Sequence, residues 1–151
     1  MKYKCVIFDC DGVLVDSEAI SCSVLLKMAK NLGLNLNWNE AIEEFSGKSL
    51  RSIIEYIEVR IKAPVPADFE TVFRQKTFAL FKSDLTPIKG IHAVLQKLSV
   101  PFCVASSGPR DKIELNLTKT QLIDYFPKAH IFSSFEIGSW KPDPKIYLYA
   151  V

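Results

Sequence analysis

The sequence predicts an α/β fold, with a doubly wound parallel sheet and an all-helical insertion. Short apolar runs alternate with helical patterns in the second half of the chain, as in parallel sheets built from strand–helix–strand units. An apolar run near the amino terminus is followed, from Ser17 to about Asp84, by helical periodicity alone. The chain therefore divides into a core, residues 1–16 and 86–151, and an inserted helical domain, residues 17–85.

The first strand and the insertion have distinct local patterns. Val6–Phe8 is a continuous apolar run that ends at a Gly-containing bend, as expected for a strand buried on both faces. In the insertion, apolar residues at helical spacing predict four helices. These are Ser17–Leu34, Asn39–Phe45, and two further helices with Ser49 and Asp68 as their N-caps.

The second half of the chain predicts the rest of the sheet. A helix that begins near Ile91 leads to an apolar strand, Pro101–Ser106, and Asp111 is expected to cap the helix that follows. His130–Ser133 is the third strand candidate, and Pro144 favours the first turn of a last helix. Because the carboxyl ends of parallel strands carry the functional groups in such folds, the site is expected there.

Composition indicates a soluble globular protein. The 151 residues are 48% apolar and 24% charged, and the net charge of +2 is too small to suggest nucleic-acid binding. The amino-terminal segment is neither a signal peptide nor a membrane span. No CxxC spacing occurs among the four cysteines, which predicts a reduced cytoplasmic protein. Cys5 and Cys103 are expected in buried strands, and the charges beside Cys10 disfavour its thiolate.

Two carboxylates directly follow the first strand. Asp9 and Asp11 are two residues apart, so their side chains point the same way. Crowding two like charges is costly, and a hard divalent cation is their natural partner. Read alone, Asp-Cys-Asp-Gly is also compatible with an ordinary turn.

The stretch CVIFDCDGVLVDSE resembles motif I of the haloacid dehalogenase superfamily, whose members are mostly phosphatases and phosphomutases. The resemblance implies a Rossmann-like core with a helical cap. It also implies that Asp9 is a nucleophile that becomes an aspartyl phosphate, and that Asp11 is the general acid and then base. Asp9 and Asp11 would both be ligands of Mg²⁺, Asp11 through its backbone carbonyl.

Two later segments match the family's order of motifs. Ser106 ends the second strand where motif II places a hydroxyl, so Ser106, Ser107 and Gly108 are candidate phosphate-binding residues. In Trp-Lys-Pro-Asp-Pro, Lys141 resembles the lysine of motif III, which pairs with the nucleophile and the phosphate. Taken without the other motifs, the segment around Ser106 is compatible with an ordinary boundary between a strand and a turn. The segment around Lys141 is likewise compatible with a solvated loop.

The insertion corresponds to the cap, which supplies substrate selectivity by closing over the phosphate site. Phe45–Lys48 resembles the loop that such caps present to the site, so Lys48 is a candidate substrate contact and Arg51 a second one. For both residues, a solvated helix face is an equally good interpretation.

The family's fourth motif, an acidic segment that supplies further metal ligands, is expected beyond Val151. The last residues look like the opening turns of a helix, so the resemblance implies a C-terminally truncated chain with an incomplete core. A Mg²⁺ ion held by one carboxylate and one carbonyl binds weakly. We therefore expect impaired activity in this 151-residue form.

Within the family, the stretches FSGKSL, ASSGP and FPKAHIFSS…IGSWKPDP are most similar to sugar-phosphate phosphatases of the 6-phosphogluconate phosphatase-like group. The implied function is Mg²⁺-dependent hydrolysis of small phosphorylated metabolites through an aspartyl phosphate, without nucleic-acid or membrane partners. Two alternatives remain open: a β-phosphoglucomutase-like phosphomutase, and an inactive truncated remnant acting as a binding module.

Overall fold

A parallel sheet organises the first unit of the computed structural model, which describes residues 3–150. Its strand order is β1 (Val6–Phe8), β2 (Phe102–Ser106) and β3 (Ile131–Ser133). Both pairings are parallel, with Val6 opposite Phe102 and Ser106 opposite Ser133. The predicted α/β fold with a parallel sheet is thereby confirmed.

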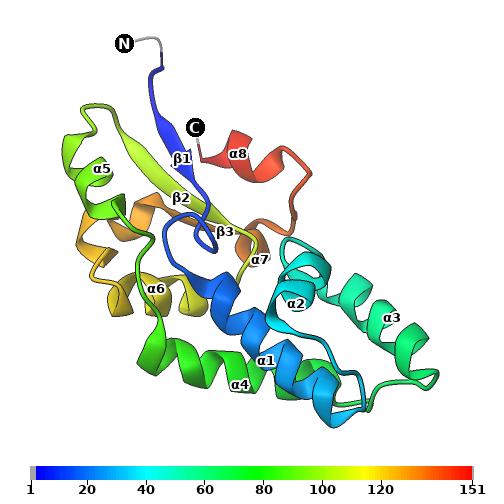
Figure 1. Cartoon of the computed structure of the whole chain (residues 1–151). Coiled ribbons are helices and arrows are strands. Elements are labelled where there is room, and N and C mark those ends of the chain that lie inside the picture. The colour runs from blue at the N-terminus through cyan, green and yellow to red at the C-terminus, as the bar shows by residue number, and fades with distance from the viewer. Residues whose placement is uncertain (1–2, 151) are drawn as a thin grey trace. The chain divides into compact units, whose positions relative to one another are not determined.

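Helices connect these strands and cover the sheet. α5 (Ile91–Lys97) leads into β2, and α6 (Arg110–Lys119) joins β2 to β3. Figure 1 shows α5 and α6 on one side of the strands and α8 (Lys145–Tyr149) on the other. α5 and α6 share a side because two right-handed crossovers follow one another in the same direction, from β1 to β2 and from β2 to β3. The remaining elements of this unit are two 3₁₀ turns, Ile123–Tyr125 and Lys128–His130, and the short helix α7 (Ser134–Ile137).

The inner face of α6 is anchored in the core of this unit. Ile113 and Leu117 are buried, as is Phe126 beyond the end of the helix. The Phe126 ring packs edge-to-face against Phe102 and Phe8, with centroids 5.4 and 6.4 Å apart. Aromatic pairs of this geometry add to the stabilisation from burial. The helix that follows β2 is therefore held firmly against the strands that carry the site.

The chain divides into two compact units, Met1–Ser17 with Asp84–Val151, and Glu18–Ser83. The elements of the second unit are all helices: α1 (Ser17–Asn31), α2 (Trp38–Phe45), α3 (Leu50–Ile61) and α4 (Phe69–Asp84). The first residue of α1, Ser17, and the last residue of α4, Asp84, belong to the first unit. Ser49 caps α3 as predicted, because its hydroxyl accepts a hydrogen bond from the Ser52 N–H. A core formed mainly by α1, α2 and α3 holds this unit together, and it comprises Cys22, Val24, Leu25, Met28, Ala29, Ala41, Phe45, Ile53, Ile57 and Phe69.

Four local expectations are wrong. The residues of β1 are only partly buried, whereas the apolar run predicted a strand buried on both faces. α1 ends at Asn31 rather than Leu34, because the turn that follows contains Gly33 at φ +92°. Asp111 does not cap α6: Pro109 occupies the N-cap position, and Asp111 lies inside the first turn. Cys5 is exposed and precedes β1, since the strand begins one residue later.

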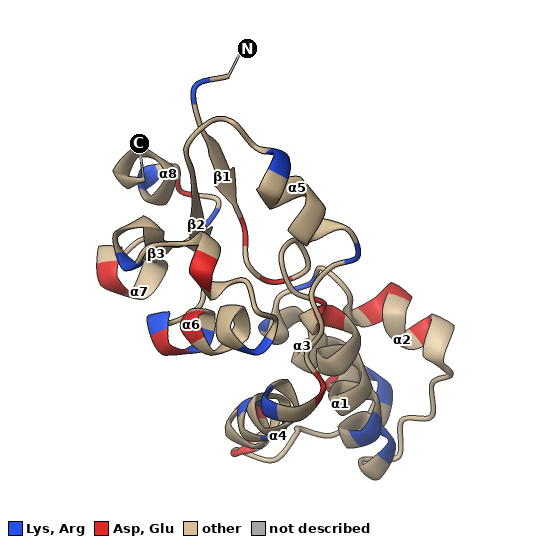
Figure 2. Cartoon of the chain, turned by 90° about the vertical axis from the view of Figure 1, so that its left-hand side faces the viewer, with Lys and Arg blue, Asp and Glu red and all other residues tan. Residues whose placement is uncertain are grey.

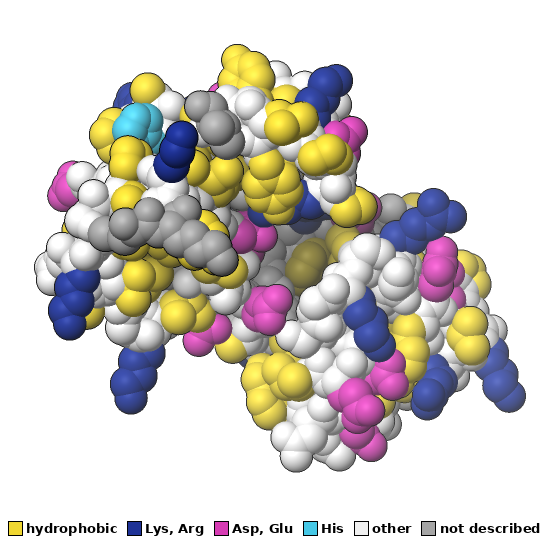
Figure 3. Space-filling model, turned by 90° about the horizontal axis from the view of Figure 1, so that it is seen from above, with side chains coloured by type: hydrophobic (Ala, Val, Ile, Leu, Met, Phe, Trp, Pro, Cys, Tyr) yellow, Lys and Arg dark blue, Asp and Glu magenta, His cyan; other side chains and the backbone are white. Residues whose placement is uncertain are grey.

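On the face in Figure 3, basic and acidic side chains are scattered among apolar ones rather than gathered into one basic patch. Within residues 3–150, no helix combines the length and the hydropathy needed to cross a bilayer.

We expect Ile57→Ala to lower the free energy of unfolding by about 2–5 kcal/mol, because the buried side chain leaves a cavity. Val59→Ala is the matched control on the same helix, since Val59 is 74% exposed; its effect should stay within about 0.5 kcal/mol. Urea unfolding followed by circular dichroism measures both. Equal losses in the two variants would contradict the packing of α3.

Candidate active site

The carboxyl ends of the three strands bring the predicted polar residues of the first unit together. Asp9 directly follows β1, Ser106 ends β2, and Ser133 ends β3 opposite Ser106. Figure 2 shows acidic residues directly after β1, at its carboxyl end. Parallel strands that end at one edge of a sheet place their following residues side by side.

Asp9 lies in an ion pair with Lys141. The Lys141 Nζ is 2.9 Å from Asp9 Oδ2 and also donates a 2.8 Å hydrogen bond to the carbonyl of Ala105. Asp9 Oδ1 accepts a 2.7 Å hydrogen bond from the N–H of Cys10. The Asp9 side chain is 41% exposed, whereas that of Lys141 is 20% exposed. An accessible carboxylate is thus held by a cation from a segment more than a hundred residues away in the chain.

The loop after β1 fixes the direction of both aspartates. The Cys10 carbonyl accepts hydrogen bonds from the N–H groups of Leu14 and Val15, and Gly12 adopts φ +74° to close the turn. The N–H of Asp16 donates to the carbonyl of Thr86 at 2.9 Å, which ties this loop to the returning chain. The loop is therefore a rigid support rather than a free connection.

Asp11 is held by side chains from two helices. Its Oδ2 lies 2.8 Å from Lys112 Nζ. Its Oδ1 accepts hydrogen bonds from Ser17 Oγ at 2.8 Å and from Asn116 Nδ2 at 3.4 Å. Our sequence reasoning missed Lys112, Asn116 and Ser17 as site residues. The one available signal was the i, i+4 spacing of Lys112 and Asn116 on the helix after β2.

The loop between β2 and α6 has the form of an anion-binding turn. The Ser106 hydroxyl is buried and accepts a 3.2 Å hydrogen bond from the Gly108 N–H. The Gly108 carbonyl accepts from Ser133 Oγ at 2.7 Å, while Ser107 is exposed. α6 begins two residues later, and the N–H groups of a first helical turn attract anions.

Lys48, the predicted substrate contact, belongs to the second unit. It follows α2, and its Nζ forms a 2.9 Å ion pair with Glu44. The alternative, Arg51, pairs with Glu55 on the surface of α3 and its side chain is 90% exposed. Any approach of these residues to the strand ends of the first unit stays a prediction.

Asp9 and Asp11 offer some of the ligands of a Mg²⁺ site, but not a complete set. Asp9 and the backbone carbonyl of Asp11 offer the hard oxygen atoms that Mg²⁺ prefers. Within residues 3–150, no three His, Cys, Asp or Glu side chains form a group able to hold a metal ion. Magnesium commonly keeps several waters and binds through one or two carboxylates together with substrate phosphate. These two donors therefore fit as one part of such a site.

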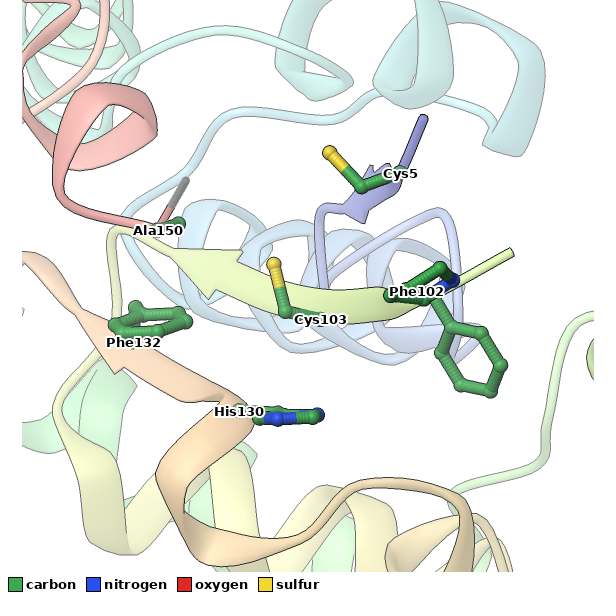
Figure 4. Close-up of a pocket in the computed structure, with 7 residues that line it drawn as sticks. Cys5, Phe102, Cys103, His130, Phe132 and Ala150 are labelled. Carbon is green, nitrogen blue, oxygen red and sulfur yellow. The ribbon is translucent and has the colours of Figure 1, made fainter. Parts of the chain in front are cut away.

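The cysteines differ in environment from one another. Burial raises the pKa of the Cys10 thiol well above its usual range, and the charge of Asp11 adds to this effect. This agrees with the expectation that Cys10 is no nucleophile. Cys5 and Cys103 line an apolar pocket at the opposite end of the strands from Asp9, together with Pro101, Phe102, His130, Phe132 and Ala150 (Figure 4).

We expect iodoacetamide at pH 8 to label Cys5 in the native protein and to leave Cys10 unmodified. Cys5 is exposed, whereas Cys10 is fully buried and its raised pKa keeps the thiol protonated. Peptide mass spectrometry after a short reaction measures both sites. The same reaction in denaturant should label both residues, and rapid native labelling of Cys10 would contradict the described loop.

Comparison with known proteins agrees with this geometry. Residues 6–151 match the family model described as haloacid dehalogenase-like hydrolase. The 6-phosphogluconate phosphatase of Escherichia coli (strain K12) is 35% identical over 150 residues, which are 99% of this chain and 67% of that protein.

Two solved structures share the fold. A haloacid dehalogenase-like protein of unknown function from Agrobacterium tumefaciens is 31% identical with a TM-score of 0.91, covering 98% of this chain and 67% of that one. A family hydrolase from Deinococcus radiodurans, with bound phosphate and sodium, is 30% identical with a TM-score of 0.80, covering 98% and 66%. The chain spans about two thirds of the length of these relatives. The family resemblance drawn from the motifs is thus confirmed, and this chain belongs to the haloacid dehalogenase-like hydrolases.

Proposed function

We propose that the protein is a Mg²⁺-dependent phosphatase that hydrolyses small phosphorylated metabolites through an aspartyl phosphate on Asp9. The observation that carries the proposal is the accessible Asp9 carboxylate, paired with Lys141 at 2.9 Å, next to the Ser106–Gly108 turn. A carboxylate attacks phosphorus only when the repulsion between two anions is offset. Lys141 supplies one such positive charge.

The first step would transfer the phosphoryl group to the protein. A carboxylate oxygen of Asp9 attacks phosphorus while the bond from phosphorus to the leaving oxygen breaks, and Asp11 gives that oxygen its proton. The Ser106 hydroxyl and the N–H groups of Ser107 and Gly108 bind the phosphoryl oxygens. In the second step, water attacks phosphorus, Asp11 takes its proton, and the bond to Asp9 breaks. The products are an alcohol and inorganic phosphate.

Magnesium completes the proposed site. The ligands from this chain would be the Asp9 carboxylate and the Asp11 backbone carbonyl. When bound, the ion supplies positive charge that shields the phosphate from the nucleophile. Support comes from the hard-oxygen character of both donors and their adjacency at the end of β1.

The substrate class we propose is sugar phosphates. The 35% identical relative is named for 6-phosphogluconate, a phosphorylated sugar acid. We assign the helical unit, residues 17–85 by our sequence prediction, the role of a cap that selects the organic part of the substrate. Lys48 would contact an anionic group of the substrate, such as its carboxylate, once its ion pair with Glu44 opens.

We expect Asp9→Asn to abolish phosphate release from 6-phosphogluconate, since an amide is a poor nucleophile. Asp124→Asn is the matched control, because Asp124 is an exposed acidic residue of a 3₁₀ turn at residues 123–125. A molybdate assay of released phosphate measures the turnover of both variants and the parent chain. Full activity of the Asp9→Asn variant would refute the nucleophile assignment. Formation of an isomeric sugar phosphate without release would favour a phosphomutase.

We expect turnover to require Mg²⁺ and to be lost when the chain is stripped with EDTA. The reason is that lysine alone leaves the nucleophile and the phosphate dianion in strong repulsion. The assay titrates Mg²⁺ into the stripped chain up to millimolar levels, with Ca²⁺ as a comparison ion of different coordination preference. Undiminished turnover in EDTA would remove the metal from the proposal.

A further inference from the structure

Three hydrogen-bond donors surround the Asp11 carboxylate and have no role of their own in the proposed chemistry. They are Lys112, Asn116 and Ser17. We name this set, with Asp11, the Asp11 clamp. Lys112 Nζ engages one oxygen of Asp11, and the hydroxyl of Ser17 and the amide of Asn116 engage the other. Both oxygens of the ionised Asp11 carboxylate, the form that acts as the base, are therefore held, which leaves its plane little freedom. In the acid form the Lys112 contact can persist on one oxygen while the other carries the proton.

The clamp lies in a largely buried setting, where such contacts are strong. Asn116 is fully buried and Ser17 is 3% exposed. The side chains of Lys112 and Asp11 are 28% and 32% exposed, so their ion pair is less screened than one on the open surface. Asn116 directs its amide group at Asp11, although its Oδ1 is then buried without a hydrogen-bond partner among residues 3–150. The Asn116 side chain also forms a hydrogen bond with the thiol of Cys10, so it contacts both Cys10 and Asp11 in the loop after β1.

The path of the Lys112 side chain connects the clamp to the phosphate turn. A Cβ placed on Gly108 would lie 3.5 Å from Lys112 Cδ and 3.6 Å from Ser106 Oγ. The lysine therefore passes beside the Ser106–Gly108 turn before it reaches Asp11. Two roles are compatible with this path: Lys112 contacts the phosphate, or it orients Asp11. The 2.8 Å ion pair and the shared hold with Ser17 and Asn116 favour orientation.

We propose that Lys112 is a positioning residue for Asp11, which holds the carboxyl of the acid and base in the orientation that reaches the leaving oxygen. This inference rests on the proposed phosphatase function. A leaving oxygen that is strongly basic needs its proton during bond cleavage, whereas a nitrophenolate departs without one. Misplacing Asp11 therefore harms the cleavage of alkyl phosphates more than that of aryl phosphates with a good leaving group.

The test compares Lys112→Met with the matched control Lys119→Met, because Lys119 is exposed at the end of the same helix. Steady-state kinetics are measured with 6-phosphogluconate and with 4-nitrophenyl phosphate at saturating Mg²⁺. For Lys112→Met we expect kcat on 6-phosphogluconate to fall about 100-fold or more, and kcat on 4-nitrophenyl phosphate by less than about 10-fold. KM should change little, and the control should match the parent chain on both esters. Lys112→Gln, a second neutral variant, should reproduce the pattern.

Each other outcome has a distinct meaning. Equal loss of kcat on the two esters overturns the positioning role, and a raised KM with unchanged kcat assigns Lys112 to phosphate binding instead. The comparison needs only turnover above the buffer background, which can be low. A parent chain that releases no phosphate above that background from either ester overturns the proposed function and, with it, this inference.

A double-mutant cycle of Asp11→Asn and Lys112→Met, followed by urea unfolding, tests the contact without any activity. If the shift of the unfolding midpoint in the double variant differs from the sum of the shifts in the two single variants, the clamp is supported. If the shift equals that sum, the clamp is overturned.

Discussion

The repulsion between two carboxylates is the constraint on which the first unit depends. Asp9 and Asp11 follow one strand two residues apart, and each has its own lysine: Lys141 at 2.9 Å and Lys112 at 2.8 Å. Two like charges so close together in a partly buried setting are costly unless opposite charges lie nearby. The two lysines come from segments separated by about thirty residues. Folding of the whole unit is therefore needed to neutralise the end of β1.

The residue between the two aspartates explains why they face the same way. Cys10 is fully buried, and its carbonyl anchors the turn through Leu14 and Val15. Since successive side chains near the end of a strand alternate in direction, an inward Cys10 turns both neighbours outward. The thiol is a small apolar group at a position where a charged side chain would be buried beside two carboxylates. Its raised pKa follows from the same burial.

Sequence reasoning predicted the parts of the site that follow from local pattern or from the family's motifs. The strand before Asp9, the strand ending at Ser106 and the paired Lys141 are of this kind. The partners of Asp11 were not predicted, because no local rule shows which face of a helix will meet a loop a hundred residues earlier. The four-residue α7 was missed for another reason: it is shorter than two helical turns, so it has no apolar periodicity to detect.

The helix α6 connects two parts of the proposed site: the turn that binds phosphate and the side chains that orient Asp11. It begins at the turn containing Ser106 and Gly108, and it carries Lys112 and Asn116 toward Asp11. At its first residue, Arg110 donates to the carbonyl of Ile131 at 2.6 Å and pairs with Glu136 on α7. A movement of α6 would therefore displace the phosphate turn and the acid together. Arg110 ties the helix to the first residue of β3 and to α7, which follows that strand. The phosphate turn and the acid therefore keep one fixed position relative to β3, as a transfer in two steps at one phosphorus atom requires.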